Sequence, residues 1–250
     1  MTSSRLPGKV LMNIEGVPML EHQLRRIKRS KFIKKIVVAT SKDQSDNPIT
    51  ELCESIGVSV YRGSLQDVLE RLYSAASFYK FDTVVRLTAD CPLTEPSLID
   101  EAIREFYKRD LDYLSNCRPP TFPDGLDVEV MRLEALKVAS NKATLPSHRE
   151  HVTPYILSMP DKFKIGNMEN SVNLSAHRWT VDETNDFKFV SKVYHFLYKD
   201  NPSFNWFDIL SLLRENPELT RINSGIDRNL ACKKLVEIDR RLSKGEQDNR

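Results

Sequence analysis

Short β-branched runs alternate with amphipathic helical patterns in the first half of the chain, and this alternation restricts the fold more than any other feature. The apolar runs lie at residues 36–39, 58–61 and 83–87. Helical spacing of apolar residues fills the segments 20–27, 49–56, 68–76 and 98–106. The third of these is opened by Ser64, with Asp67 three residues later, which resembles a capping box. Such alternation is typical of β-α-β units, and a compact run such as 36–39 suits a strand covered on both faces. We therefore predict an α/β fold with a mostly parallel sheet.

The second half is less regular. From about 118 to 179 the pattern is broken by prolines, with a short strand pattern at 127–130 and a helical stretch after Arg132. Another strand is predicted at 178–181. Helical patterns dominate the segment 186–243, and the last of them is a charged terminal helix. At 250 residues the chain fits one domain that spans residues 1–250, with the segment 118–179 as an excursion from it.

Composition excludes several classes of protein. The 37 basic and 35 acidic residues nearly cancel, to a net charge of +2, so neither disorder nor a surface for nucleic acid is indicated. The cysteines are far apart and lack C-x-x-C spacing, which favours reduced thiols; they are Cys53, Cys91, Cys117 and Cys232. No apolar run is long enough to cross a bilayer. We expect a soluble, cytoplasmic protein that binds neither nucleic acid nor membrane.

Polar residues follow each predicted strand of the first half. Thr40 and Ser41 come after the first run, Arg62 and Ser64 after the second, and Asp90 after the third. In open parallel sheets, ligands bind at the carboxyl ends of the strands, where these loops converge. A lone aspartate after a strand is more commonly a turn former or a helix N-cap, so Asp90 by itself is a weak signal.

A second acidic cluster follows the strand predicted at 178–181. We interpret Asp186 as the N-cap of the helix that comes next. Asp182 is not needed as a cap, and it stands at the end of the strand. Mg²⁺ is commonly bound by a few carboxylates together with substrate phosphates. Asp90 and Asp182 could therefore hold one Mg²⁺ between two strand ends.

The amino-terminal segment supplies the complementary charge. Ser3, Ser4, Arg5 and Lys9 place two hydroxyls, a guanidinium and an ammonium in one short loop. These are the groups that neutralise a triphosphate and orient a leaving pyrophosphate. The Walker spacing of a phosphate-binding loop is absent. Taken alone, these residues are better explained as a flexible basic terminus.

With these pieces in order, the chain resembles the cytidylyltransferase family, which includes CMP-Kdo synthetase and acylneuraminate cytidylyltransferase. It is most similar to the branch that acts in spore-coat polysaccharide biosynthesis. Seven motifs carry the resemblance: S-S-R-L-P-G-K-V-L at 3–11, V-V-A-T-S at 37–41, Y-R-G-S-L-Q-D-V-L-E-R at 61–71, V-R-L-T-A-D-C-P-L at 85–93, F-P-D-G-L-D-V-E-V at 122–130, R-E-H-V-T-P-Y at 149–155 and W-T-V-D-E at 179–183. They run in the family's order and cover most of the chain.

The resemblance implies a three-layer α/β/α fold of the nucleotide-diphosphosugar transferase type. It also implies transfer of CMP from CTP to an acidic sugar or similar acceptor, with Mg²⁺ on Asp90 and Asp182 and release of pyrophosphate. The catalytic residues would be Arg5, Lys9, Asp90 and Asp182. The nucleotide would contact Ser3, Ser4, Arg5, Lys9, Thr40, Ser41, Arg62, Ser64, Asp67 and Thr88. The acceptor side would be lined by Asp124, Asp127, Glu129, Arg149 and His151. The segment 118–179 pairs protomers in relatives, which implies a homodimer.

Some alternatives stay open at this stage. His151 is equally well explained as a buried, hydrogen-bonded helix residue. Relatives carry a hydrophobic first strand ahead of the segment that begins here at Met1, so we expect translation to start upstream. A metal-dependent glycosyltransferase would normally present Asp-x-Asp where this chain has Asp90 alone. A catalytically silent paralogue that acts as a binding or dimer partner is the second alternative.

Overall fold

The computed structural model describes residues 5–226, 228 and 239. The predictions for Ser3, Ser4, Cys232 and a charged terminal helix lie outside the described residues. Within the described part, no helix has the length and apolar character needed to cross a membrane. The three cysteines described there, Cys53, Cys91 and Cys117, are all free thiols.

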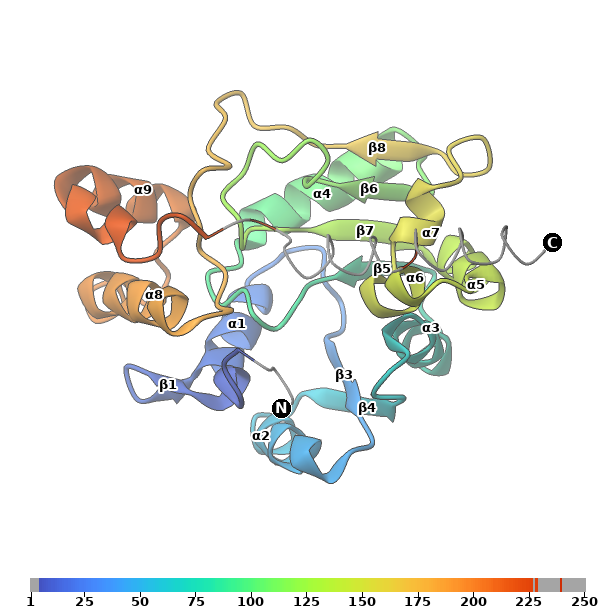
Figure 1. The fold of residues 1–250 in the computed structure, drawn as a ribbon, viewed down its shortest axis with the longest axis horizontal. Coiled ribbons are helices and arrows are strands. Elements are labelled where there is room, and N and C mark those ends of the chain that lie inside the picture. The colour runs from blue at the N-terminus through green and yellow to red at the C-terminus, as the bar shows by residue number, and fades with distance from the viewer. Residues whose placement is uncertain (1–4, 227, 229–238, 240–250) are drawn as a thin grey trace.

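Helices and strands alternate along the chain (Figure 1). The strands are β1 (Asn13–Ile14), β2 (Val17–Pro18), β3 (Val37–Ser41), β4 (Ser59–Gly63), β5 (Thr83–Arg86), β6 (Tyr113–Ser115), β7 (Glu129–Arg132) and β8 (Ile165–Asn167). The α-helices are α1 (Met19–Ile27), α2 (Asn47–Ser55), α3 (Val68–Phe78), α4 (Pro96–Lys108), α5 (Leu133–Lys142), α6 (Pro146–His151), α7 (Pro154–Leu157), α8 (Thr184–Leu197) and α9 (Trp206–Glu215). Short 3-10 helices are η1 (Lys9–Leu11), η2 (Gln44–Asp46) and η3 (Pro217–Arg221).

The predicted α/β class is confirmed, with mixed sheets. β3 and β4 form a parallel pair, and β1 and β2 form an antiparallel hairpin. The larger sheet has the order β5-β7-β6-β8, in which β7 is antiparallel to both neighbours and β8 is parallel to β6. In the described part of the chain β3 pairs only with β4 and β5 only with β7, and no described strand corresponds to the expected hydrophobic first strand.

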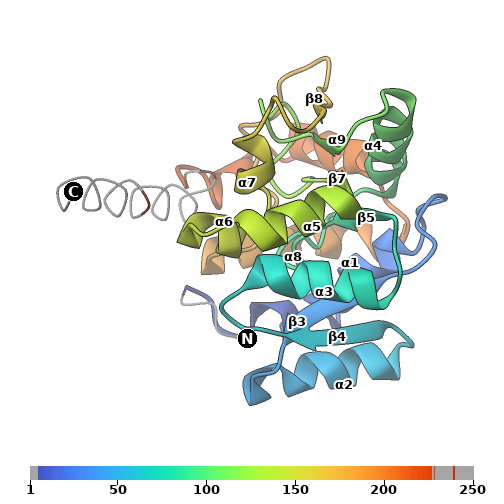
Figure 2. The ribbon, with the colours of Figure 1, turned by 90° about the vertical axis from the view of Figure 1, so that its right-hand side faces the viewer.

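The larger sheet separates two apolar cores. Leu114 and Val130 belong to the core that contains α4, whereas Tyr113 and Met131 belong to the core that contains α3 and α5. Successive side chains of a strand point to opposite faces, so each strand contributes to both cores. Helix α4 lies on one side of the sheet and α5 on the other (Figure 2). This is the layered arrangement that the family resemblance implied.

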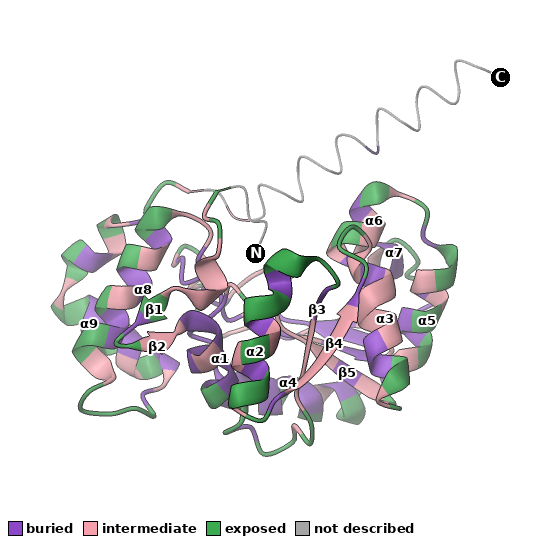
Figure 3. Ribbon diagram, turned by 90° about the horizontal axis from the view of Figure 1, so that it is seen from below, coloured by how far each residue is buried: buried purple, intermediate pink, exposed green. Residues whose placement is uncertain are grey.

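A third core lies under the parallel pair β3–β4. Leu20 and Leu24 from α1 meet Ile49 and Cys53 from α2 and the buried Val58. Figure 3 shows α2 with a buried and an exposed face, as the sequence periodicity predicted. The packed cores and the paired strands thus support the loops after β3, β4 and β5.

Two helix starts differ from their predictions. Asp67, not Ser64, is the N-cap of α3, and it accepts a hydrogen bond from the Glu70 N–H. Ser64 Oγ instead accepts from the Asp67 N–H. Helix α8 begins after Glu183, so Asp186 is the third helical residue of a capping box rather than the N-cap. In both cases the sequence spacing located the start of the helix but assigned the N-cap to the wrong residue.

The segment 118–179 is more regular than expected, since it contains β7, α5, α6, α7 and β8. The strand predicted at 127–130 begins at Glu129. The strand predicted at 178–181 is wrong: Arg178 makes only an isolated bridge with Asp124. The Trp179 N–H donates to the Asp124 carbonyl and the Val181 N–H to the Asp90 carbonyl. This extended segment therefore joins two loops instead of entering a ladder.

Substitution of Gly125 tests the close approach between its loop and the extended segment that contains Trp179 and Thr180. Its φ is +109°, and a Cβ there would lie 2.6 Å from both Thr180 N and Trp179 C. Backbone strain and overpacking each cost of the order of 1–3 kcal/mol, so Gly125→Ala should lower the free energy of unfolding by about 3 kcal/mol. Gly57 has φ +67° and open space around it, so Gly57→Ala should lose only about 1 kcal/mol. Urea unfolding measures both, and equal losses would contradict the close approach.

Candidate active site

Asp90 and Asp182 come from different parts of the chain and are held next to each other by the backbone. Asp90 follows β5, and Asp182 precedes α8. The Val181 N–H donates to the Asp90 carbonyl at 2.7 Å, and Thr180 Oγ1 donates to the same oxygen at 3.3 Å. The predicted meeting of these two carboxylates is therefore present, although only one of them follows a true strand.

Lys9 lies between the two carboxylates. Its Nζ is 2.9 Å from Asp182 Oδ1 and 3.5 Å from Asp90 Oδ2. The same ammonium donates to the Val181 carbonyl at 2.7 Å. Only 12% of the Lys9 side chain is exposed. Oxygens of both carboxylates thus converge on a single cationic group.

Arg5 brings a second positive charge to Asp182. Arg5 Nη2 is 3.1 Å from Asp182 Oδ2, and Nη1 is 3.7 Å from Glu183 Oε1. Burial alone would raise the pKa of Asp182, but Lys9, then Arg5 and Arg178, outweigh it and lower the pKa below its ordinary value. Asp182 is therefore an ionised carboxylate at neutral pH. All four residues predicted to be catalytic lie together.

Arg178, which the sequence interpretation missed, organises this cluster. Its guanidinium donates to Asp186 through Nε and Nη2, both at 2.9 Å, to Asp124 at 3.0 Å and to Asp182 at 3.3 Å. Asp186 is fully buried, and its carboxylate also accepts the backbone N–H groups of Asp182 and Glu183 at 3.0 Å. The available signal was the spacing, because Arg178 precedes Asp182 and Asp186 by four and eight residues.

Asp124 and Asp127 form an adjoining acidic group. Asp124 contacts Arg178 through Oδ2 and Arg228 Nε through Oδ1, the latter at 3.5 Å. Arg228 Nη2 is 2.5 Å from Asp127 Oδ1. Burial and the nearby Asp127 raise the pKa of Asp124 to about 6, in spite of Arg228 and Arg178. Arg228 carries no local sequence signal for this contact, which joins residues 101 positions apart.

Glu129 belongs to a separate buried network. It forms an ion pair with Arg86, and its Oε1 accepts hydrogen bonds from the hydroxyls of Tyr113 at 2.5 Å and Thr153 at 2.9 Å. Burial acts to raise the pKa of Glu129, but Arg86 and the hydroxyl donors lower it overall. Glu129 therefore stays ionised and holds Arg86 in place at the end of β5.

His151 lies at the end of α6, in the field of Arg86. Burial, and then the positive charge of Arg86, lower the pKa of His151 below its ordinary value. The ring is therefore neutral at pH 7. In the described part of the chain, the buried His151 Nε2 has no hydrogen-bond partner. The alternative of a fully hydrogen-bonded core histidine does not fit this atom.

The remaining predicted residues make contacts that stabilise loops. Arg149 Nε is 2.9 Å from Asp67 Oδ2, and its Nη1 donates to the Ser140 carbonyl at 2.6 Å. Arg149 therefore ties α6 to the N-terminus of α3. Thr88 Oγ1 lies 3.4 Å from Cys91 Sγ.

The hydroxyls predicted near the nucleoside also bond within the protein. Thr40 Oγ1 and Ser41 Oγ donate to Asp46 Oδ2 at 2.7 and 2.6 Å. Arg62 Nε donates to the Ser41 carbonyl at 2.8 Å, and its Nη1 donates to Asn47. These bonds fix the shape of the loops after β3 and β4, so any nucleotide contact there would use other donors or rearranged side chains.

The donor set around Asp90 and Asp182 suits Mg²⁺ better than a metal caged by protein alone. Among residues 5–226, 228 and 239, no group of three or more His, Cys, Asp or Glu side chains gathers to hold a metal. The two carboxylates are 28% and 22% exposed and already converge on the Lys9 ammonium. Mg²⁺ characteristically takes one or two carboxylates and completes its shell with water and phosphate. These two residues therefore fit a Mg²⁺ site shared with a nucleotide.

Comparisons with known proteins identify the family. Residues 1–202 match the model of a family described as cytidylyltransferase. An uncharacterized protein of Methanocaldococcus jannaschii is 40% identical over 227 residues, which cover 90% of this chain and 91% of that protein. The spore coat polysaccharide biosynthesis protein SpsF of Bacillus subtilis is 29% identical over 225 residues, which cover 87% of this chain and 92% of that protein.

A solved structure supports the same family assignment. The structure of a cytidylyltransferase from Leptospira borgpetersenii superposes with a TM-score of 0.85 at 32% identity, and the match covers 91% of this chain and 95% of that one. The family match, together with the fold shared with this structure, identifies the chain as a nucleotidyltransferase. The chain belongs to the cytidylyltransferase family, whose members use CTP as the nucleotide donor.

Arg178 allows a test of the cluster's energetics. Its side chain is 8% exposed and neutralises buried carboxylates, so Arg178→Met leaves Asp186 and Asp124 without their main partner. Breaking such a buried pair costs about 3–5 kcal/mol of the free energy of unfolding. Arg25→Met is a matched control, because Arg25 is 51% exposed and pairs with Glu21 on the surface of α1, where the loss is about 1 kcal/mol or less. Denaturant unfolding measures both variants. Similar losses in the free energy of unfolding for Arg178→Met and Arg25→Met would contradict the role of Arg178 in holding the buried carboxylates.

Proposed function

We propose that the chain transfers the cytidylyl group of CTP to a hydroxyl of an acidic, sugar-like acceptor and releases pyrophosphate. The observation that carries the proposal is the meeting of the basic segment Arg5 to Lys9 with the carboxylates of Asp90 and Asp182. A triphosphate needs cationic donors beside it and a metal that its phosphates share with a few carboxylates. The cluster offers both the cationic donors and two carboxylates that would hold such a metal.

The positions of the charged side chains suggest how the transfer would proceed. Arg5 and Lys9 would bind the β- and γ-phosphates, while the acceptor hydroxyl oxygen attacks the α-phosphorus in line. A bond forms between the acceptor oxygen and the α-phosphorus while the bond from the α-phosphorus to the oxygen that bridges it to the β-phosphate breaks. The hydroxyl proton passes to solvent, and pyrophosphate leaves with the bridging oxygen. Mg²⁺ held by Asp90 and Asp182 would supply charge neutralisation on the phosphates. Arg178 and Asp186 keep Asp182 aimed at this point.

The acceptor side has chemistry suited to an anionic sugar. Arg86 uses Nη1 for Glu129, which leaves further N–H groups of its guanidinium for a ligand. His151 Nε2, buried and unpartnered among the described residues, is a second polar group near Arg86. Asp127 is 29% exposed and can accept from sugar hydroxyls. The name of the Bacillus subtilis relative supports a role in surface polysaccharide biosynthesis.

We also propose that the protein is a cytoplasmic homodimer that pairs through the segment 118–179. Two exposed apolar side chains of this segment, Met159 at 40% and Val172 at 59%, support pairing there. Sedimentation equilibrium tests it: a dimer that Met159→Asp weakens is expected, and a monomer at all concentrations would contradict the proposal.

Pyrophosphate release tests the proposed reaction. The purified chain is mixed with Mg²⁺, CTP and a panel of acceptors that includes 3-deoxy-manno-octulosonate and N-acetylneuraminate. Pyrophosphate that appears only with CTP and an acceptor supports the proposal. Release of a nucleoside diphosphate from a sugar nucleotide would instead indicate a glycosyltransferase. No release from any member of a broad panel, despite intact folding, would favour a silent paralogue.

Two variants test the carboxylate pair. Asp90→Asn and Asp182→Asn should each lower turnover at least about 100-fold, because the amide cannot hold the metal or balance its charge. Asp161→Asn, at an exposed aspartate in a loop, should turn over like the parent chain. Thermal unfolding checks that all three variants are folded. Turnover of Asp90→Asn at the parent's rate in excess Mg²⁺ would overturn the assignment.

A further inference from the structure

The ammonium of Lys9 is surrounded by three oxygen acceptors. Asp182 Oδ1, Asp90 Oδ2 and the Val181 carbonyl lie 2.9, 3.5 and 2.7 Å from Nζ. Lys9 Nζ thus donates hydrogen bonds to Asp182 and to the Val181 carbonyl and forms an ion pair with Asp90. The side chain is mostly buried, and its charge is confined to the point where the two carboxylates converge.

Asp182 has both of its oxygens engaged. Lys9 takes Oδ1, whereas Arg5 and Arg178 take Oδ2 at 3.1 and 3.3 Å. A metal ion would have to approach within about 2.1 Å of one of these oxygens. Two cations on one carboxylate oxygen repel each other strongly in a partly buried site. Lys9 and a divalent cation therefore compete for the same oxygens.

We propose that Lys9 and the divalent metal exclude each other on Asp90 and Asp182, so that the metal binds tightly only after a nucleotide has drawn Lys9 away. This inference rests on the proposed function, since the triphosphate is the group that offers Lys9 another partner. It assigns Lys9 a second role, that of setting the order of binding. CTP and metal then raise each other's affinity by the same factor.

The exchange requires little movement of the backbone. Lys9 belongs to η1, whose neighbouring residues Val10 and Leu11 pack against the apolar cores. The Leu11 N–H donates to the Gly8 carbonyl at 2.9 Å, which closes the turn. The loop thus stays in place while the flexible Lys9 side chain turns from the carboxylates to the phosphates. Rotamer changes of this kind are fast and need no unfolding.

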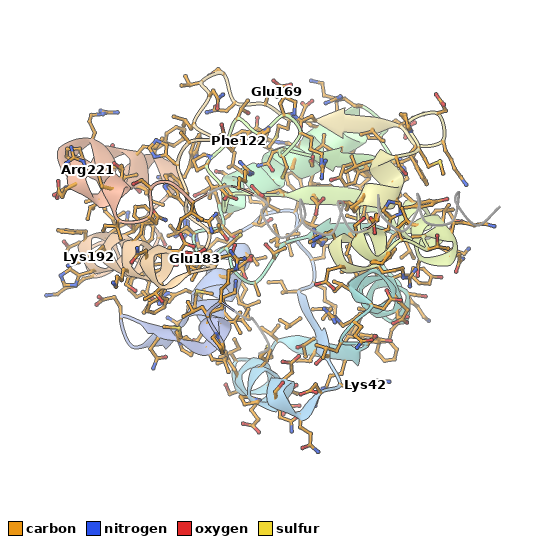
Figure 4. The ribbon with its side chains drawn as sticks, viewed as in Figure 1. Lys42, Phe122, Glu169, Glu183, Lys192 and Arg221 are labelled. Carbon is orange, nitrogen blue, oxygen red and sulfur yellow. The ribbon has the colours of Figure 1, made fainter. Side chains whose placement is uncertain are left out.

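The test uses Mn²⁺ as the metal probe, with free Mn²⁺ counted by electron paramagnetic resonance. Without nucleotide, Lys9→Met should bind Mn²⁺ about tenfold more tightly than the wild-type chain, since one competing charge is removed. Lys192→Met is the matched control: Lys192 lies on the outer side of α8, away from Glu183 (Figure 4), and its loss should change nothing. Lys9→Arg keeps the cation and should leave Mn²⁺ binding weak.

The outcomes separate this inference from the proposed function. Unchanged or weaker Mn²⁺ binding by folded Lys9→Met would overturn the exclusion, even if the chain transfers CMP. Tighter binding in Lys9→Met that disappears in Lys9→Met with Asp182→Asn supports it, even if no acceptor is ever turned over. With CTP present, the wild-type chain should gain Mn²⁺ affinity about tenfold more than Lys9→Met does. An equal gain in both chains would also contradict the exclusion.

Discussion

The buried ion pair between Arg178 and Asp186 is the interaction on which the rest of the site depends. Asp186 is fully buried and accepts two N–H groups from the guanidinium and two from the backbone of Asp182 and Glu183. An isolated buried carboxylate would be very costly, so the pair forces the turn before α8 into one shape. The same guanidinium reaches Asp124 and Asp182, and a single side chain thereby fixes these carboxylates relative to each other.

Next to that ion pair, the carboxylate of Asp182 is surrounded by three cationic side chains. Asp182 is kept ionised by Lys9, Arg5 and Arg178, although burial alone would favour its neutral form. Two of these cations, Arg5 and Lys9, come from the distant amino-terminal loop, whereas Arg178 lies four residues before Asp182. The cluster is therefore assembled by the tertiary fold as well as by the local sequence before α8.

The sequence predicted the parts of this molecule that are locally encoded. Alternating runs located β3, β4 and β5, and the ordered motifs selected Arg5, Lys9, Asp90 and Asp182, which the fold brings together. Strand order was not predictable, because no local pattern places β7 between β5 and β6. Arg228 was missed for the same reason, since its partners lie about a hundred residues away. Asp186 was found but misread, because spacing alone cannot separate an N-cap from the third residue of a capping box.

In our proposal, the carboxylates of Asp90 and Asp182 bind Lys9 before the nucleotide arrives and the metal afterwards. Anomalous diffraction from crystals of the chain with CTP and Mn²⁺ tests it most directly, because it locates the metal independently of any assay. The account predicts a Mn²⁺ peak bonded to Asp90 and Asp182 and to the phosphates, with Lys9 turned away from both carboxylates onto the triphosphate. A metal bound elsewhere, or a metal on these carboxylates with Lys9 still between them, would contradict it.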